Sequence, residues 1–305
     1  MSTAERVIVN DVGPRDGLQN QATILTPSQR LQLIQALVDA GVDHIEFGAF
    51  VSPKAVPAMA GAAEMATNLP SGDVHYTALI PNRKGYELAR DAGVRSMGLV
   101  VCASNTMNEK NIRMGTEDAM AVAGGVMELA KADGCDVQVY LSTAWECPFE
   151  GAVDPDVVVE LAARLLELGA SQVVVSDTIG AANPGEVHSL LSRLIDTVGA
   201  DVLAAHFHDT RAMGMANAYA ALDAGIRRFD ASVGGLGGCP FAPGATGNIA
   251  TEDLVMMLHL MGYETGINLD KLLAAGQLAG ELTGQCTGGR AYPWLSRNVD
   301  RIHPR

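Results

Sequence analysis

Two histidines separated by one residue, His206 and His208, form the clearest chemical pattern in this sequence. Residues two apart on a β-strand project from the same face, so both imidazoles would point the same way and could bind one divalent metal ion. Asp16 and the amide oxygen of Asn248 would complete a set of nitrogen and oxygen ligands that Mg²⁺, Mn²⁺ and Zn²⁺ all accept. The alternative is that the histidine pair only forms hydrogen bonds within a polar layer.

Further residues could take part directly in catalysis. Arg15 precedes Asp16, Glu46 and Asp177 lie within apolar runs of the chain, and Cys239 lies in a glycine-rich segment. A glycine-rich loop can close as a lid, which would deliver the Cys239 thiol to a substrate as a proton donor. A flexible connection and a phosphate-binding loop are the alternative interpretations of these glycines. A carboxylate at the end of a strand can equally be a structural cap.

Eight short runs rich in Val, Ile and Leu alternate with helical segments, and these elements would position the polar residues. The alternation is typical of parallel strands joined by crossover helices. It predicts an α/β protein with a (β/α)8 TIM barrel, rather than a doubly wound open sheet, and places reacting groups at the C-terminal ends of the strands. The runs span residues 7–12, 44–50, 74–80, 96–102, 136–142, 172–178, 201–208 and 227–233.

The helical segments carry recognisable start and stop signals. Thr26 or Ser28 can cap the helix that Gly41 ends, and two later helices open on Asp or Asn before a proline. We expect residues 1–262 to form the TIM-barrel catalytic domain and residues 263–305 to form a C-terminal helical extension packed on it, as one domain overall. The long helices of the extension favour a homodimer.

Composition excludes several classes of partner. The 305 residues carry a formal net charge of −14, which opposes binding to nucleic acid or to anionic lipid. The sequence has neither a membrane-spanning apolar stretch nor a signal peptide at its start, so we expect a cytoplasmic protein. Its 5 cysteines include no CxxC pair, which indicates a reducing compartment and no thiolate zinc site.

The sequence resembles the 3-hydroxy-3-methylglutaryl-CoA lyases, within a wider group of barrels that includes the isopropylmalate and homocitrate synthases. The resemblance runs almost from end to end, and the glycine loop around Cys239 is its most specific part. The matching motifs are VGPRDGLQN at 12–20, FVSPKAVPAM at 50–59, KNI at 110–112, CPFEG at 147–151, SDTIGAANPG at 176–185, HFHDT at 206–210 and VGGLGGCPFAPGATGNIATEDLV at 233–255.

The resemblance implies a divalent-metal-dependent carbon–carbon lyase that splits a hydroxyacyl-CoA into acetyl-CoA and a keto acid. Mg²⁺ or Mn²⁺ is the expected ion, and Zn²⁺ is the alternative. Arg15 would stabilise the enolate oxygen of the nascent acetyl-CoA, and Cys239 would protonate the enolate carbon. Asp177 would lie near the substrate hydroxyl, and Glu46 would support the metal site. The implied metal ligands are Asp16, His206, His208 and Asn248.

Several positions depart from the pattern of these lyases and leave the acyl group open. Because these positions lie at strand ends or in loops near the mouth of the barrel, we expect them to affect which acyl group fits. Citramalyl-CoA or a longer 3-hydroxy-acylglutaryl-CoA is the alternative substrate, a condensing synthase is a further alternative, and a ligand-binding barrel without activity is the least favoured. The departures are Phe47, Gly48, Asn105, Phe149 and Arg211.

The acid role of Cys239 leads to a test. We expect Cys239→Ala to fold, retain metal and bind the CoA ester, but to cleave it at least about a hundredfold more slowly, because a positioned acid contributes on the order of 10²–10⁴ in rate. Steady-state kinetics measure this loss. Alanine at Cys102, Cys135, Cys147 or Cys286 should leave most activity intact. Near wild-type cleavage by Cys239→Ala would transfer the acid role to another group.

Overall fold

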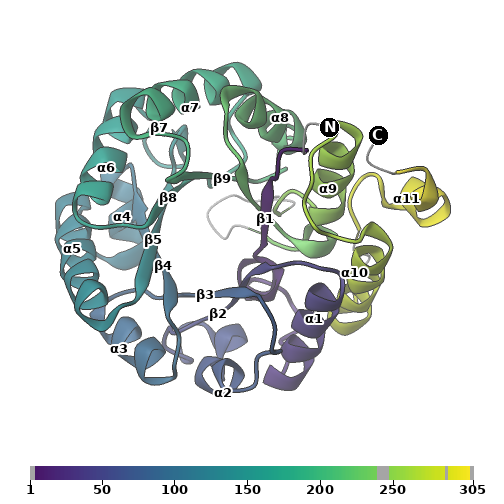
Figure 1. The fold of residues 1–305 in the computed structure, drawn as a ribbon. Coiled ribbons are helices and arrows are strands. Elements are labelled where there is room, and N and C mark those ends of the chain that lie inside the picture. The colour runs from purple at the N-terminus through teal and green to yellow at the C-terminus, as the bar shows by residue number, and fades with distance from the viewer. Residues whose placement is uncertain (1–3, 239–246, 286–287, 303–305) are drawn as a thin grey trace.

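The computed structural model describes residues 4–238, 247–285 and 288–302, and its centre is a closed barrel of parallel strands (Figure 1). Around the barrel the strand order is β1-β10-β9-β8-β5-β4-β3-β2. All eight predicted runs form these strands, so the TIM-barrel prediction is confirmed. The strands are β1 Ile8–Asp11, β2 His44–Ala49, β3 His75–Leu79, β4 Ser96–Cys102, β5 Asp136–Ser142, β8 Gln172–Asp177, β9 Leu203–Phe207 and β10 Arg228–Ala231.

Helices form a ring outside the strands, and their caps follow the sequence signals. Thr26 caps α1 in a reciprocal capping box with Gln29, and Asn183 caps α7 in the same way with Glu186. Thr26, rather than Ser28, is therefore the cap of the first helix. The ring helices are α1 Pro27–Asp39, α2 Ala62–Ala66, α3 Arg83–Asp91, α5 Thr116–Asp133, α6 Pro155–Glu167, α7 Pro184–Val198, α8 Gly214–Ala224 and α9 Thr251–Leu260.

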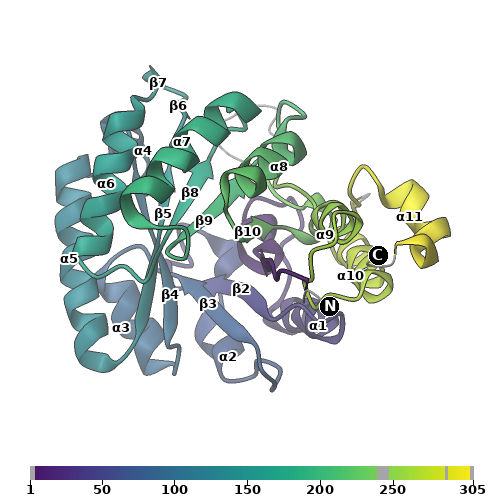
Figure 2. The same ribbon diagram turned by 45° about the horizontal axis from the view of Figure 1, so that its top comes forward.

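Short insertions follow several strands at their C-terminal ends. A single π-helical turn, η1 Gly13–Gly17, follows β1; α4 Asn105–Ile112 follows β4; and a small hairpin of β6 Glu146–Cys147 and β7 Gly151–Ala152 follows β5. Figure 2 shows α4 and this hairpin at the same end of the barrel. The remaining short turns are η2 Pro57–Met59, η3 Val233–Gly235 and η4 Val299–Arg301.

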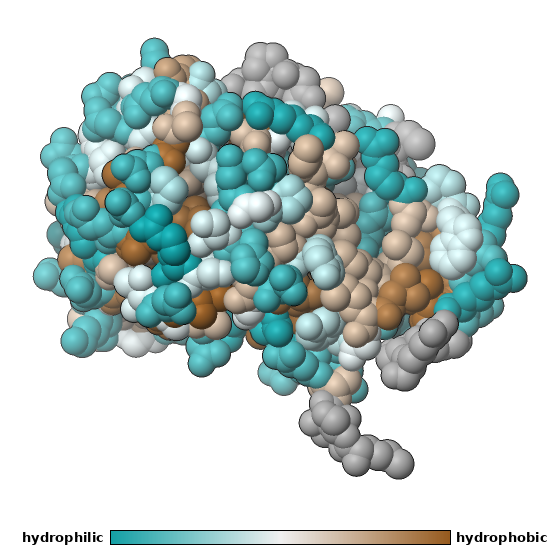
Figure 3. Space-filling model, turned by 90° about the horizontal axis from the view of Figure 1, so that it is seen from above, coloured by the Kyte–Doolittle hydropathy of each residue, from teal (hydrophilic) through white to brown (hydrophobic). Residues whose placement is uncertain are grey.

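The C-terminal part of the chain adds α10 Leu269–Thr283 and α11 Tyr292–Asn298. Helix α10 lies beside α1 on the outside of the barrel, and α11 lies farther out (Figures 1 and 2). In Figure 3 one hydrophobic patch lies on the right-hand part of the face, and other hydrophobic residues are scattered over its left and centre. None of the helices in the described ranges is both long and apolar enough to cross a membrane.

A buried arginine shapes the strand that carries Glu46. Arg30 of α1 is fully buried and donates hydrogen bonds to the carbonyl oxygens of Phe47 at 3.1 Å and Ala60 at 3.2 Å. The pairing of β2 with β3 shifts between Glu46 and Gly48, and a Cβ at Gly48 would lie 2.9 Å from the Arg30 guanidinium. Glycine at this position therefore leaves room for the arginine that holds the end of β2.

We expect Arg30→Met to lower the free energy of unfolding by about 2–4 kcal/mol, because the carbonyl groups that Arg30 satisfies would stay buried without donors. Urea denaturation followed by circular dichroism measures this change. The exposed Arg83→Met is the control and should shift the free energy by less than about 0.5 kcal/mol. Equal stability of the two variants would contradict a structural role for Arg30.

Candidate active site

A cavity of about 260 Å³ opens at the C-terminal ends of the strands. One wall carries the polar residues that the sequence singles out, namely Arg15, Asp16, His206 and His208. Apolar side chains also line the cavity, among them Leu79, Val100 and Met107. The cavity thus combines polar groups from β9 and the segments that follow β1 and β9 with apolar side chains from β3, β4 and α4, at the end of the barrel where this fold places reacting groups.

The turn after β1 delivers Arg15 and Asp16 to this cavity, and it depends on two glycines. A Cβ at Gly13 would lie 2.7 Å from Asp11 Oδ1, and a Cβ at Gly17 would lie 2.7 Å from Ser232 Oγ. Any side chain at these positions would displace its neighbours. The tight π-helical turn therefore requires glycine at both ends, and such turns are frequent at functional sites.

Asp16, His206 and His208 form a cluster whose ligand atoms all lie within 4.8 Å of one another. The Nε2 atoms of the two histidines are 3.3 Å apart, and His208 Nε2 lies 3.8 Å from Asp16 Oδ2. Asn248 joins this group because its Nδ2 donates to Asp16 Oδ2 at 2.8 Å. The structure therefore clusters Asp16, His206 and His208 and places the side-chain amide of Asn248 beside Asp16.

Hydrogen bonds on the far side of each imidazole set its orientation. His208 Nδ1 lies 2.6 Å from the Thr178 carbonyl oxygen, which only accepts, so this nitrogen carries a proton. His206 Nδ1 faces Asp230 Oδ2 at 3.0 Å. When both rings are neutral, their Nε2 lone pairs therefore converge, which is the arrangement that a metal ion stabilises.

The chemistry of the remaining donor fits a divalent cation as well. Asn248 Oδ1 is buried and has no hydrogen-bond partner among the described residues. A buried acceptor without a donor is costly, and a cation bound beside it would remove that cost. Two imidazole nitrogens, a carboxylate and an amide oxygen suit Mg²⁺, Mn²⁺ or Zn²⁺.

Electrostatics keep the cluster ready for a cation. Burial alone would raise the pKa of Asp16, but Arg15 and the histidines hold that pKa below its ordinary value, so the carboxylate stays ionised. Burial opposes protonation of His206, whereas Asp230 raises its pKa. A proton on His206 would donate to His208, so protons and a metal ion compete for the same place between the rings.

Arg15 is held from three directions. Its Nε donates to Glu46 Oε2 at 2.5 Å, its Nη1 donates to Asp16 Oδ1 at 2.8 Å, and its guanidinium carbon lies 5.7 Å from the Tyr140 ring centroid. Burial by itself lowers the pKa of Arg15, but the two carboxylates raise it above its ordinary value. The guanidinium is therefore permanently charged and fixed in orientation at the edge of the cavity.

Glu46 forms its ion pair with Arg15 and not with either histidine. It is fully buried, and its Oε1 accepts a hydrogen bond from the Tyr140 hydroxyl at 3.2 Å. Tyr140 in turn packs edge-on against His206, with ring centroids 6.3 Å apart. Glu46 and Tyr140 thus link Arg15 to the cluster of Asp16, His206 and His208 through direct contacts.

Asp177 lies outside this cluster. Its two carboxylate oxygens accept hydrogen bonds from the backbone N–H groups of Ala181 at 2.8 Å and Ala182 at 3.1 Å. Burial raises the pKa of Asp177, and these two hydrogen bonds oppose that rise. The carboxylate thereby fixes the turn after β8, which also provides the Thr178 carbonyl that orients His208.

Cys239 lies outside the described residues, so its role stays a prediction. The residue before it, Gly238, lines the cavity, and its carbonyl oxygen accepts a hydrogen bond from Asn20 Nδ2 at 2.9 Å. A second cysteine, Cys102, lines the cavity from β4, but burial raises the pKa of its thiol to about 12. Cys102 therefore remains a neutral thiol.

Phe47 and Gly48 lie at the C-terminal end of β2, as expected, but neither lines the cavity. Phe47 is fully buried in the hydrophobic core against Tyr76, and Gly48 faces Arg30, because the register shift in β2 turns both toward the helices. The other three lie on or near the rim of the barrel. Asn105 caps Thr116 N–H, Phe149 is exposed beneath Lys110, and Arg211 pairs with Glu146.

Two residues of the site escape the sequence analysis. Tyr140 lies in a run of apolar residues, where an aromatic ring is ordinary, so its sequence carries no signal of function. Asp230 does carry one, since a carboxylate inside a buried strand is costly unless it has partners. That cost could have identified Asp230 as the second partner of a histidine.

A model of the HMGL-like family matches residues 6–279 of this chain. The chain belongs to the HMGL-like family. It is 43% identical over 300 residues to a hydroxymethylglutaryl-CoA lyase of Pseudomonas mevalonii, covering 98% of this chain and 100% of that protein. It is 40% identical over 312 residues to an (R)-citramalyl-CoA lyase of Chloroflexus aurantiacus, covering 99% of this chain and 97% of that protein.

A solved structure of this family is similar over its full length. It is an HMG-CoA lyase from Acinetobacter baumannii in complex with coenzyme A and 3-methylmalate, with a TM-score of 0.93 and 38% sequence identity. The match covers 100% of this chain and 99% of that one. The HMGL-like barrel described above therefore has the fold of its family throughout.

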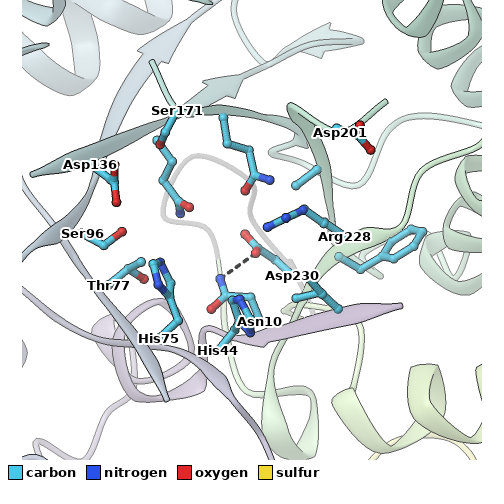
Figure 4. A pocket seen from close by; sticks show the side chains of 15 residues that line it. Asn10, His44, His75, Thr77, Ser96, Asp136, Ser171, Asp201, Arg228 and Asp230 are labelled. Carbon is cyan, nitrogen blue, oxygen red and sulfur yellow. Dashed lines mark hydrogen bonds between the residues drawn. The ribbon is translucent and has the colours of Figure 1, made fainter. Parts of the chain in front are cut away.

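The contact between Asp230 and His206 generates a prediction for this HMGL-like protein. Asp230 Oδ1 accepts a hydrogen bond from Asn10 Nδ2 at 2.8 Å, and both residues line a second cavity (Figure 4). We expect Asp230→Asn to weaken Mn²⁺ binding about 10–100-fold, because the histidine loses the carboxylate that holds its tautomer.

Calorimetric titration with Mn²⁺ measures this effect without any assay of activity. Asn10→Ala keeps the Asp230 charge and removes one hydrogen bond to it, so this control should lose less affinity than Asp230→Asn. A dissociation constant for Asp230→Asn equal to that of the wild type would remove Asp230 from the metal site.

Proposed function

We propose that this protein is a divalent-metal-dependent carbon–carbon lyase that cleaves 3-hydroxy-3-methylglutaryl-CoA, or a close analogue, to acetyl-CoA and acetoacetate or the matching keto acid. One observation carries the proposal: a charged, fixed guanidinium and a His–Asp cluster share one wall of a single cavity. Relatives named as lyases of this kind match the chain along almost its whole length.

Each residue of the polar wall has a role in this reaction. Asp16, His206, His208 and Asn248 would hold the cation, which when bound supplies Lewis acidity toward the substrate oxygens. Arg15 stabilises the negative charge that develops on the thioester oxygen as the carbon–carbon bond breaks. Glu46 and Tyr140 hold the guanidinium in place, so it does not reorganise during the reaction. Cys239 donates the proton that converts the enolate carbon to a methyl group.

We assign Asp177 an indirect role. Both of its oxygens accept hydrogen bonds from the backbone of the turn after β8, and this turn carries the carbonyl that orients His208. Because both oxygens already accept these hydrogen bonds, Asp177 would support the metal site by fixing the turn that orients His208. This assignment replaces direct contact with the substrate hydroxyl.

A citramalyl-CoA lyase is the competing proposal, because one relative at 40% identity carries that name. Leu79, Val100 and Met107 line the same cavity as the polar groups, so the substituent on the hydroxyl-bearing carbon would contact these apolar side chains. These three side chains therefore decide between a methyl-bearing acyl group and a longer one.

We further propose a cytoplasmic homodimer. The absence of a CxxC pair among the 5 cysteines of the sequence supports a reducing compartment. Exposed apolar side chains that support self-association include Tyr219 on α8, Leu260 on α9 and Trp294 on α11.

The lyase proposal predicts that cleavage requires a divalent cation. Removal of metal with EDTA should abolish activity, and Mg²⁺ or Mn²⁺ should restore it, with acetyl-CoA as a product identified by mass spectrometry across a panel of 3-hydroxyacyl-CoA thioesters. His206→Ala and His208→Ala should fold but lose metal, because each removes one ligand. The exposed His188→Ala is the matched control and should keep full occupancy.

Elemental analysis of the variants gives the metal content directly. Full occupancy in both His206→Ala and His208→Ala would exclude this metal site. Release of free CoA from acetyl-CoA and a 2-keto acid, without cleavage of any thioester in the panel, would instead identify a condensing synthase.

A further inference from the structure

The second cavity, which Asn10 and Asp230 line, lies at the N-terminal end of the barrel and has a volume of about 250 Å³. His44, His75 and Arg228 line it, and each is the first residue of its strand. The candidate active site lies instead where the strands end, and the two cavities share no lining residue. The barrel therefore has a hollow at each end, and only one of them contains the residues assigned to the lyase reaction.

The lining of this second cavity is unusually polar for the inside of a TIM barrel, which apolar branched side chains normally fill. Alternation along the strands directs Arg228 and Asp230 of β10, and His75 and Thr77 of β3, to the inside. These side chains leave a space of roughly eight water volumes, at about 30 Å³ each. Proteins depart from such packing rules mainly at functional sites, so the hollow indicates a place for a ligand.

Two polar atoms of the lining, Thr77 Oγ1 and Asn10 Oδ1, are buried and have no hydrogen-bond partner among the described residues. The Thr77 side chain belongs to a residue that is only 2% exposed. The Asn10 amide is fixed in orientation, because its Nδ2 donates to Asp230 Oδ1 and its oxygen would be repelled there. A buried acceptor without a donor costs free energy, so both oxygens suit a ligand that donates hydrogen bonds.

The charges of the lining also lack partners. Figure 4 shows the Arg228 side chain extending toward the middle of the cavity, with Asp230 beside it. Within the described part of the chain, neither Arg228 nor Asp136 forms an ion pair. The described lining has three carboxylates, of Asp136, Asp201 and Asp230, against this one guanidinium. A simple anion would therefore meet net negative charge, whereas a ligand that carries both charges would be attracted by both kinds of group.

We infer that this cavity binds a small zwitterion, with its carboxylate on Arg228 and its ammonium group toward Asn10 Oδ1 and Thr77 Oγ1. A guanidinium is planar and can donate two parallel hydrogen bonds to a carboxylate. An ammonium group has three N–H donors, which the two buried oxygens lack. Amino acids of few atoms carry both groups and fit the volume of the cavity. This site is independent of the proposed reaction, because it shares no lining residue with the candidate active site.

Titration of the protein with small amino acids tests the site. The probes are L-alanine and β-alanine, isomers that differ in the spacing of their charged groups. Metal is first removed with EDTA and dialysis, so that neither probe binds through a metal ion. We expect at least one probe to bind with a dissociation constant on the order of 0.1–1 mM, measured by calorimetry. L-Lactate has a hydroxyl in place of the ammonium group of L-alanine and should bind at least about tenfold more weakly.

Two variants locate the binding site. Arg228→Gln removes the charge that holds the carboxylate and should weaken binding at least about tenfold. Arg95→Gln is the matched control, because Arg95 is exposed beside the first residue of β4 and does not line the cavity; it should change the affinity less than about twofold. Thr77→Val removes the unpartnered hydroxyl and should weaken binding about threefold to tenfold without lowering the melting temperature.

Failure of both amino acids to bind the wild-type protein would overturn the inference. Equal affinity of the wild type and Arg228→Gln would also overturn it, because binding would then occur elsewhere. Lactate that binds as tightly as the better amino acid would contradict a zwitterionic ligand. A lower melting temperature of Thr77→Val would show that the hydroxyl has a structural partner and would remove it from the site.

Discussion

The buried positive charge of Arg15 constrains the rest of the active site. A guanidinium removed from water needs carboxylates with good geometry, since leaving it unpaired would cost several kcal/mol. Glu46 meets its Nε and Asp16 meets its Nη1, and each of these carboxylates then requires further partners. The Tyr140 hydroxyl donates a hydrogen bond to Glu46. Asn248 donates one to Asp16, and His208 lies beside the same carboxylate. The arginine and the metal cluster therefore form one connected network, and displacement of either carboxylate would disturb both.

Close packing of the strands makes this network fit inside a barrel. A Cβ at Gly98 on β4 would lie 2.8 Å from the Tyr140 ring, and a Cβ at Gly48 would meet the Arg30 guanidinium. Glycine at these positions creates space for large polar side chains from neighbouring elements. Gly98 and Gly48 thus support the site only by leaving space for the side chains beside them.

The strands and the pairing of His206 with His208 could be predicted from the sequence because each depends on a local pattern. A continuous apolar run identifies a strand buried on both faces, and the spacing of His206 and His208 determines that they share a face. The orientation of Phe47 and Gly48 could not be predicted, because the register shift in β2 depends on Arg30 from another element. Tyr140 was missed for a related reason, since its role exists only through contacts with distant residues.

The two kinds of positive charge in this protein have different physical consequences. Arg15 is surrounded by carboxylates within hydrogen-bond distance, so it produces little field beyond the cavity and acts only on an atom placed beside it. Lys54 and Lys84 are exposed and have no ion pair in the described part of the chain, so their field extends into solvent over roughly a Debye length, about 8–10 Å at physiological salt. A neutralised buried cation suits charge that develops during a reaction, whereas uncompensated surface cations suit charge that a ligand already carries. The proposed bond cleavage therefore depends on the buried network, which fixes Arg15 in place before any charge develops.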